Sequence, residues 1–145
     1  MIAHTQTLAR SFKHFTGHYL LAGHFSETEL AQKLFESPFV VVSHGTEADP
    51  ILNYGNQAAL ALWEMSWEEF TSTPSRLTAE MPRREERARV LDAVTRRGFV
   101  NDYSGVRISR SGRRFEISSA MVWNLISKDG TPSGQAATFS QWRFI

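Results

Sequence analysis

The stretch RISRSGRRFEI (residues 107–117), together with LISKDGTPSGQ (residues 125–135), decides the fold predicted for this chain. Each stretch places a tight-turn dipeptide, Ser111-Gly112 or Asp129-Gly130, between segments rich in apolar residues. Such dipeptides favour two-residue β-hairpin loops, because glycine readily adopts the positive φ that these turns need. We therefore expect three neighbouring antiparallel strands, at about residues 99–109, 114–126 and 134–144.

Two-residue loops would fix which residues face one another across both hairpins. The pairs expected on the inner face are Ile108–Phe115, Val106–Ile117, Val100–Trp123, Phe144–Phe115, Trp142–Ile117 and Ala136–Trp123. On the other face, Glu116 is expected between Arg107 and Arg143, where opposite charges attract one another. A bulge in either loop would invert part of this register.

Small polar residues interrupt the predicted inner face. Ser104, Ser119 and Ser140 form one rung across the strands. A concave apolar surface with a few polar groups is the usual form of a small-molecule pocket. In the alternative, side chains of the helices fill the space and the hydroxyls form local hydrogen bonds. The residues expected to bind a ligand are Trp63, Arg76, Asp102, Ser104, Ser119, Met121, Trp123, Thr138 and Ser140.

Asp102 is the ionisable residue with the most consequential predicted position. A carboxylate on the inner face would pair with an arginine such as Arg76, contact a ligand or hold a proton, because an unpaired buried charge is costly. We assign no catalytic residue and expect no enzyme. The alternative is a small α+β isomerase or hydrolase with Asp102 as general base, and a solvent-exposed Asp102 would remove it. Arg76 is either a structural clamp or an anion contact.

The residues before the first strand are predicted to be helical. Residues 1–37 form an N-terminal helical extension and residues 38–145 the core of the same single domain. An apolar stripe at helical spacing runs through Leu8, Phe12, Phe15 and Tyr19 and on to Ala22. This stripe is expected to cover the outer face of the sheet, either within one chain or across a homodimer.

Further helices have recognisable start signals. Ser26 with Glu29 and Ser66 with Glu69 form capping boxes, and Asn56 is expected to cap a third helix. A long helix is expected at about residues 83–97. Short strands are expected at about residues 39–42 and 51–54.

The predicted order of helix, two strands, several helices and three strands resembles a PAS domain. Residues 53–60 (NYGNQAAL) resemble the PAS turn from the second strand into the first core helix. Residues 74–76 (PSR), 112–115 (GRRF) and 122–125 (VWNL) make the chain similar to the MEKHLA-domain family, over about residues 8–142.

This resemblance implies an α+β, PAS-like fold with a five-stranded antiparallel sheet and helices over one face. It also implies a sensory or regulatory module that binds a small organic ligand or a protein partner. A dimerisation or interaction module without a ligand is a further alternative. The cofactor stays unknown, because the resemblance implies no agreed ligand.

The amino-acid composition limits which cofactors and metals the chain could bind. The chain has no cysteine, which excludes a flavin–cysteinyl adduct and thiolate metal ligands. Residues 83–97 contain no histidine, so haem is disfavoured. His14 and His18 have no third ligand in their pattern, so we expect no metal site.

The charge pattern and hydropathy limit the partners. Residues 76–114 hold eleven arginines and five acids, but no aromatic residues alternate with the arginines of the predicted helix. This pattern favours a solvated helix face over a nucleic-acid surface. No apolar run reaches the roughly 20 residues that span a bilayer. We therefore expect no membrane association and a cytoplasmic location.

Overall fold

The computed structural model describes residues 1–80 and 84–145, apart from the side chains of residues 84, 87 and 91. Antiparallel strands form one sheet in the order β2-β1-β5-β4-β3, and β6 pairs with β4. The strands are β1 (Val40–His44), β2 (Leu52–Gly55), β3 (Phe99–Ile108), β4 (Arg114–Ile126), β5 (Pro132–Phe139) and β6 (Gln141–Phe144). The predicted α+β architecture is confirmed.

The helices are α1 (Ile2–Thr16), α2 (Glu27–Phe35), α3 (Gln57–Trp63), α4 (Trp67–Phe70), the 3-10 helix η1 (Ser75–Thr78) and α5 (Arg84–Arg97). Both predicted capping boxes are present, at Ser26 and Ser66. Asn56 caps α3, since its side chain accepts a hydrogen bond from the Ala59 amide. Residue 83, where α5 was expected to begin, lies outside the described residues.

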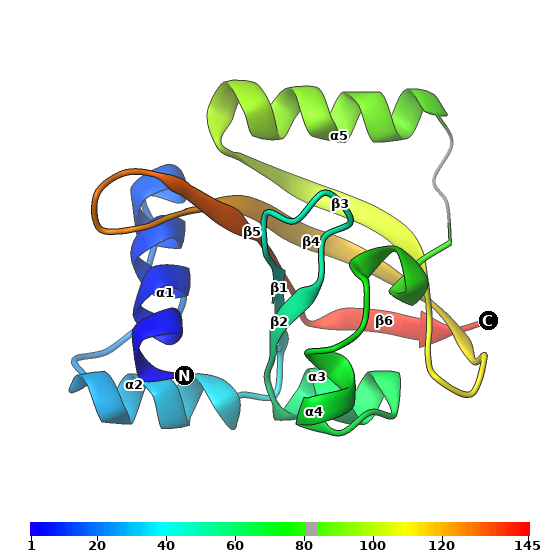
Figure 1. Ribbon diagram of the computed structural model, residues 1–145, viewed down its shortest axis with the longest axis horizontal. Coiled ribbons are helices and arrows are strands. Elements are labelled where there is room, and N and C mark those ends of the chain that lie inside the picture. The colour runs from blue at the N-terminus through cyan, green and yellow to red at the C-terminus, as the bar shows by residue number, and fades with distance from the viewer. Residues whose placement is uncertain (81–83) are drawn as a thin grey trace.

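Helices pack on both faces of the sheet (Figure 1). Side chains of α3, α4 and α5 share one apolar core with the sheet, which includes Trp63, Phe70 and Val94. Leu8 of α1 and Leu34 of α2 belong to a second core on the other face. The sheet is therefore a wall between two apolar layers, and this arrangement positions the cavity described below.

The β3–β4 hairpin differs from its prediction by one residue. Ser109 donates its N–H to the Arg113 carbonyl oxygen at 2.9 Å, so the loop holds three residues and ends in Gly112 at φ 86°. Such a loop, with a left-handed residue at its end, is a common alternative to the two-residue turn. Arg107 consequently lies opposite Phe115.

The three β3–β4 pairs predicted for the inner face are wrong. Val106 lies opposite Glu116, and Val100 lies opposite Val122. Ile108 lies opposite Arg114. Because side chains alternate between faces, a shift of one residue moves Arg107 from the predicted outer face to the inner one.

The β4–β5 and β4–β6 pairs are as predicted, although the loop is again one residue longer than expected. Ser127 donates its N–H to the Thr131 carbonyl oxygen, which leaves a three-residue loop. A register shift between Leu125 and Ile126 then compensates for the extra residue. Phe115–Phe144, Ile117–Trp142 and Trp123–Ala136 are confirmed pairs, and Arg143 forms an ion pair with Glu116 at 3.2 Å.

A line of irregularities crosses the sheet. Asp102 and Ser119 have positive φ angles of 61° and 54°, and Ser140 separates β5 from β6. At each irregularity the alternation of side chains is interrupted, as it is at bulges. If odd-numbered residues face one side of the sheet before the break, even-numbered residues face that side after it. On β4, Ile117 before the break and Val122 after it consequently belong to the same core.

Helix α1 is shorter than the predicted stripe. Gly17 ends it with a left-handed C-cap (φ 78°), and its N–H donates to the Lys13 carbonyl oxygen. Glycine adopts this conformation at little cost, which explains the stop. Tyr19 lies beyond the helix and is 70% exposed. In the described part of the chain, no helix is both long and apolar enough to cross a membrane.

Candidate ligand-binding cavity

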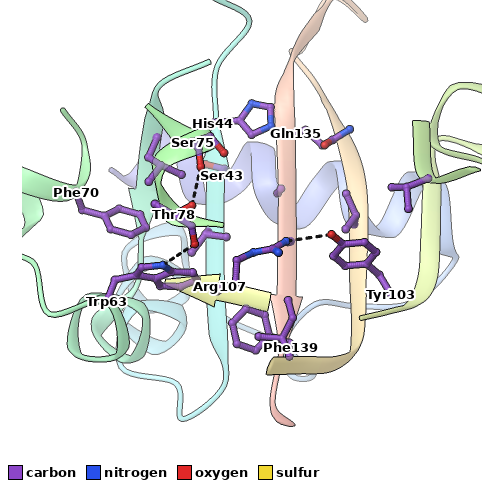
Figure 2. Close-up of a pocket in the computed structure, with 17 residues that line it drawn as sticks. Ser43, His44, Trp63, Phe70, Ser75, Thr78, Tyr103, Arg107, Gln135 and Phe139 are labelled. Carbon is purple, nitrogen blue, oxygen red and sulfur yellow. Dashed lines mark hydrogen bonds between the residues drawn. The ribbon is translucent and has the colours of Figure 1, made fainter. Parts of the chain in front are cut away.

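A cavity of about 160 Å³ lies between the sheet and the helices of the first core (Figure 2). Its apolar wall includes Phe70, Ile117, Val122, Ala137 and Phe139. These residues come from α4, β4 and β5, so elements distant in sequence enclose the space together. Mostly apolar walls with a few polar groups are typical of sites for small molecules.

Trp63 forms one side of the cavity and is only 2% exposed. Its ring makes edge contacts with Phe115 and Phe139, at centroid distances of 5.3 and 6.2 Å. Its indole N–H donates to the Thr78 carbonyl oxygen at 3.3 Å. These contacts hold the indole in place, so Trp63 provides a rigid aromatic wall.

Arg107 and Tyr103 provide the polar side, from inward positions on β3 that have Gly105 between them (Figure 2). The guanidinium carbon of Arg107 lies 5.5 Å from the Tyr103 ring centroid, within cation–π distance. One guanidinium nitrogen donates to the Tyr103 hydroxyl at 3.4 Å and another to the Val106 carbonyl oxygen at 3.2 Å. Among the described residues, no carboxylate forms an ion pair with Arg107.

Gly105 makes room for this arginine–tyrosine pair. A Cβ atom at this position would lie 2.9 Å from both the Arg107 terminal nitrogen and the Tyr103 hydroxyl oxygen. Real Cβ atoms do not approach neighbours so closely, and therefore any larger residue would displace the two polar groups. The absence of a side chain at residue 105 thus leaves room for the cation in its observed position.

The segment containing η1 covers another side of the cavity. Thr78 donates its hydroxyl to the Ser75 carbonyl oxygen at 2.7 Å, which closes the turn locally. Glu80 donates its N–H to the Val106 carbonyl oxygen at 3.1 Å, and Ser75 donates to that of Pro50 at 2.8 Å. Backbone hydrogen bonds therefore tie this cover to β3 and to the loop that precedes β2.

His44 and Gln135 lie together at one end of the cavity (Figure 2). The His44 Nδ1 atom forms a hydrogen bond with the Gly45 carbonyl oxygen at 2.9 Å. Gln135 donates to the Asn124 side chain at 3.4 Å. Polar groups consequently occur at this end, whereas Phe139 and Ile117 contribute apolar surface.

The structure brings together only part of the predicted ligand set. Trp63 lines the cavity from α3, on the helical side, as predicted. Met121, Trp123 and Thr138 face the α1 side instead, because the break at Ser119 exchanges the faces of β4. Trp123 donates its indole N–H to the Leu8 carbonyl oxygen at 3.2 Å, and Thr138 donates its hydroxyl to that of Val40 at 2.8 Å.

The predicted polar rung does not line the cavity. Asp102, Ser104, Ser119 and Ser140 are all exposed to solvent. Their rung coincides with the line of irregularities, where small polar side chains suit the bent, solvated backbone. Asp102 is exposed, whereas the enzyme alternative required a buried carboxylate beside an open cavity. The alternative of an Asp102-dependent enzyme is therefore withdrawn.

Arg76 lies outside the cavity as well. Its guanidinium forms an exposed ion pair with Asp49 at 3.1 Å, with 63% of the arginine side chain accessible. This contact connects η1 to the loop between β1 and β2. Of the two roles considered for Arg76, the observed contact is that of a clamp.

The predicted dimer stripe packs on its own chain. Leu8 is fully buried and Phe12 is 5% exposed, and the Phe12 ring meets Trp123 edge-on at 4.8 Å. Phe15 lies over Gly98, where a Cβ atom would be only 2.1 Å from its ring. Leu8 and Phe12 are thus packed within their own chain, and a homodimer through the stripe stays a prediction. The expected cover of the outer face is confirmed, by α1 of the same chain.

Sequence reasoning missed Arg107 and Tyr103. The turn segment Ser109–Arg113 contains the relevant signal, because a glycine in the last of three loop positions suits the left-handed residue of a longer hairpin loop. With that loop length, the alternation of β3 places both side chains toward the helices. The bulge at Asp102, beyond which the inward positions of β3 change from odd to even, has no comparable signal.

Comparisons with solved structures show the class to which this fold belongs. A PAS domain from Colwellia psychrerythraea superposes with a TM-score of 0.64 at 16% identity, covering 81% of this chain and 95% of that one. An RNA-binding light-oxygen-voltage receptor gives 0.63 at 18% identity, covering 81% and 34%. A PAS domain from a two-component sensor histidine kinase gives 0.59 at 16% identity, covering 82% and 96%. The chain has a PAS-like fold.

The family is also shown. The MEKHLA domain matches residues 2–144, and the chain belongs to this family. Homeobox-leucine zipper protein HOX32 of Oryza sativa subsp. japonica is 27% identical over 156 residues. Its counterpart from subsp. indica is 26% identical over the same length. Each alignment covers 99% of this chain and 17% of the relative, so the chain spans about a sixth of the length of these proteins.

Proposed function

We propose that this domain is a sensory or regulatory module that binds a small organic molecule in the cavity beside Trp63, Tyr103 and Arg107. The observation that carries the proposal is the cavity itself, of about 160 Å³, at the centre of the PAS-like core. A dry apolar cavity of roughly 150 Å³ is large enough to bind benzene. A ligand the size of one aromatic ring therefore matches the space.

The wall shared by the two cores supports a regulatory role. Val122 contacts the cavity, whereas the next residue of β4, Trp123, contacts α1 through the Leu8 carbonyl. On β5, Ala137 packs against the first core, whereas its neighbour Ala136 belongs to the second core on the α1 side. A ligand that shifts these strands would also shift the surface on which α1 rests. The receiver of such a signal would be a partner protein that contacts the domain.

Filling the cavity tests the proposal. The side chain of Ala137 contacts the cavity, so Ala137→Leu should occupy part of the space. We expect fluorobenzene to bind the native domain saturably in a ¹⁹F NMR titration, and Ala137→Leu to weaken this binding at least about fivefold. Ala61→Leu, on an exposed face of α3, is the matched control and should bind like the native protein.

The folded state of each variant would be checked by urea denaturation, because overpacking costs about 1–3 kcal/mol. Absence of saturable binding by the native domain, or equal binding by a folded Ala137→Leu variant, would count against a ligand site in this cavity.

A further inference from the structure

Arg107 is a cation at the edge of an otherwise mostly apolar cavity. Its side chain is half-buried, and its described contacts are the Tyr103 hydroxyl, the Tyr103 ring and its neighbour's carbonyl oxygen. A guanidinium has five N–H donors in a planar fork, and these contacts leave donors available. Other arginines of the described chain, such as Arg76 and Arg143, form ion pairs with acidic residues at the surface.

We infer that the cavity selects a small organic monocarboxylate, with its carboxylate on Arg107 and its apolar body against Trp63 and Phe139. This inference rests on the proposed function and adds the chemical class of the ligand. A carboxylate accepts two parallel hydrogen bonds from a guanidinium, which gives both strength and orientation. The Tyr103 hydroxyl lies beside the guanidinium and supplies a further donor to the same anion.

The size and charge of the cavity set limits on the ligand. About 160 Å³ accommodates roughly one ring or a short branched chain beside the anchoring group. Among the described residues that line the cavity, Arg107 is the single arginine or lysine. One guanidinium balances one carboxylate, so a monoanion suits this site better than a dicarboxylate or a phosphate ester, whose additional charge would be desolvated without a partner.

The position of the anchor depends on Gly105. The φ angle of Gly105 is outside the left-handed region, so alanine at this position meets no backbone strain. The added methyl group would instead meet the Arg107 terminal nitrogen and the Tyr103 hydroxyl at 2.9 Å. Gly105→Ala thus displaces the anchor without removing its charge, which separates the effect of geometry from the effect of charge.

The test compares 4-fluorobenzoate with its neutral isostere 4-fluorobenzamide in ¹⁹F NMR titrations of the whole chain. We expect the native domain to bind the carboxylate at least about tenfold more tightly, and Arg107→Gln to abolish this preference. Gly105→Ala should reduce the preference as well. Arg113→Gln is the matched control, because Arg113 is exposed on the same hairpin and stacks on Phe144 away from the cavity.

Fluorobenzene distinguishes the two proposals. If fluorobenzene binds but the carboxylate has no advantage over the amide, the inference about the ligand class is overturned and the cavity proposal stands. A carboxylate preference that survives in folded Arg107→Gln also overturns it. If none of the three probes binds, both the cavity proposal and the inference about the ligand class are overturned.

Discussion

Asn56 connects three segments of the chain through one buried side chain. Its amide nitrogen donates to the carbonyl oxygens of Leu34 and Phe39, at 3.1 and 2.8 Å. Its side-chain oxygen accepts from the backbone amides of Val41 and Ala59, at 3.1 and 3.2 Å. The residue is fully buried, so these four hydrogen bonds are shielded from water, although the Leu34 carbonyl oxygen also accepts from the Ser37 amide at 3.3 Å.

Replacing this side chain should destabilise the fold strongly. Asn56→Ala removes four buried hydrogen bonds, and a buried group left unsatisfied costs about 1–3 kcal/mol when nothing compensates. Partial relaxation lowers the sum, so we expect a loss of about 2–4 kcal/mol in the free energy of unfolding, measured by urea denaturation. Asn101→Ala, at an exposed position of β3, is the control. A change below about 0.5 kcal/mol in Asn56→Ala would contradict this account.

The local signals around such residues could be predicted from sequence. The caps at Ser26, Asn56 and Ser66 depend on residues within three positions of one another, so the printed sequence contains all that is needed. The links from Asn56 to Leu34 and Phe39 could not be predicted in this way. They depend on where a separate segment lies in space.

At the scale of elements, α1 is attached to the sheet by polar and apolar contacts. The His4 ring forms a hydrogen bond with the Ser43 hydroxyl at 2.9 Å and lies 5.8 Å from the Tyr54 ring. Burial lowers the pKa of His4 below its ordinary value of 6.5, and the charge of the N-terminus lowers it further. The folded domain therefore favours the neutral form of the His4 imidazole, which lies between α1 and the sheet.

This pKa shift predicts how stability depends on pH. Below about pH 6.5 the unfolded chain binds a proton at His4 more readily than the folded chain does, so protonation favours unfolding. The contribution of His4 is fully present above pH 6.5 and declines as the pH falls toward the lower folded-state pKa. Urea denaturation between pH 8 and pH 5 should give a steeper loss of stability for the native chain than for His4→Gln.

His18→Gln provides the comparison, since His18 is exposed and lies beyond the end of α1. The native slope should persist in this variant. If the stability of the native chain and that of His4→Gln fell equally with decreasing pH, the lowered pKa of His4 would be contradicted.

The strands show where prediction from sequence stops. The three-strand order, both hairpins and the β4–β6 pairs follow from turn residues and alternation. The faces of β3 did not, because Arg110–Gly112 form a loop one residue longer than assumed. The polar rung of Ser104, Ser119 and Ser140 was correctly located across the sheet but wrongly interpreted. A pocket lining and a line of bulges can both place small polar residues in neighbouring strands.

At the scale of the whole molecule, the cavity and α1 share β4 and β5 as a common wall. Protein interiors are close-packed, so a displacement on one face of such a wall is transmitted to the other. The Trp123–Leu8 hydrogen bond and the Phe12–Trp123 contact connect that wall to α1. This arrangement makes α1 the element whose behaviour should report on the cavity.

Hydrogen exchange can measure this coupling. With saturating 4-fluorobenzoate, we expect amides of α1 to exchange at least about twofold more slowly, in addition to those of β4 and β5 that border the cavity. Ala137→Leu at the same probe concentration should show a smaller change. Slower exchange confined to the cavity-lining strands, with α1 unaffected, would argue against transmission through the sheet.

The breaks at Asp102, Ser119 and Ser140 also affect how related chains should be compared. Because the inward positions of β4 are odd-numbered up to Ile117 and even-numbered from Ala120, no single alternating template describes the whole strand. An alignment that matches hydrophobic periodicity with one fixed phase would be correct on one side of Ser119 and would reverse inside and outside on the other. Homologous positions in this sheet are better assigned separately for each half.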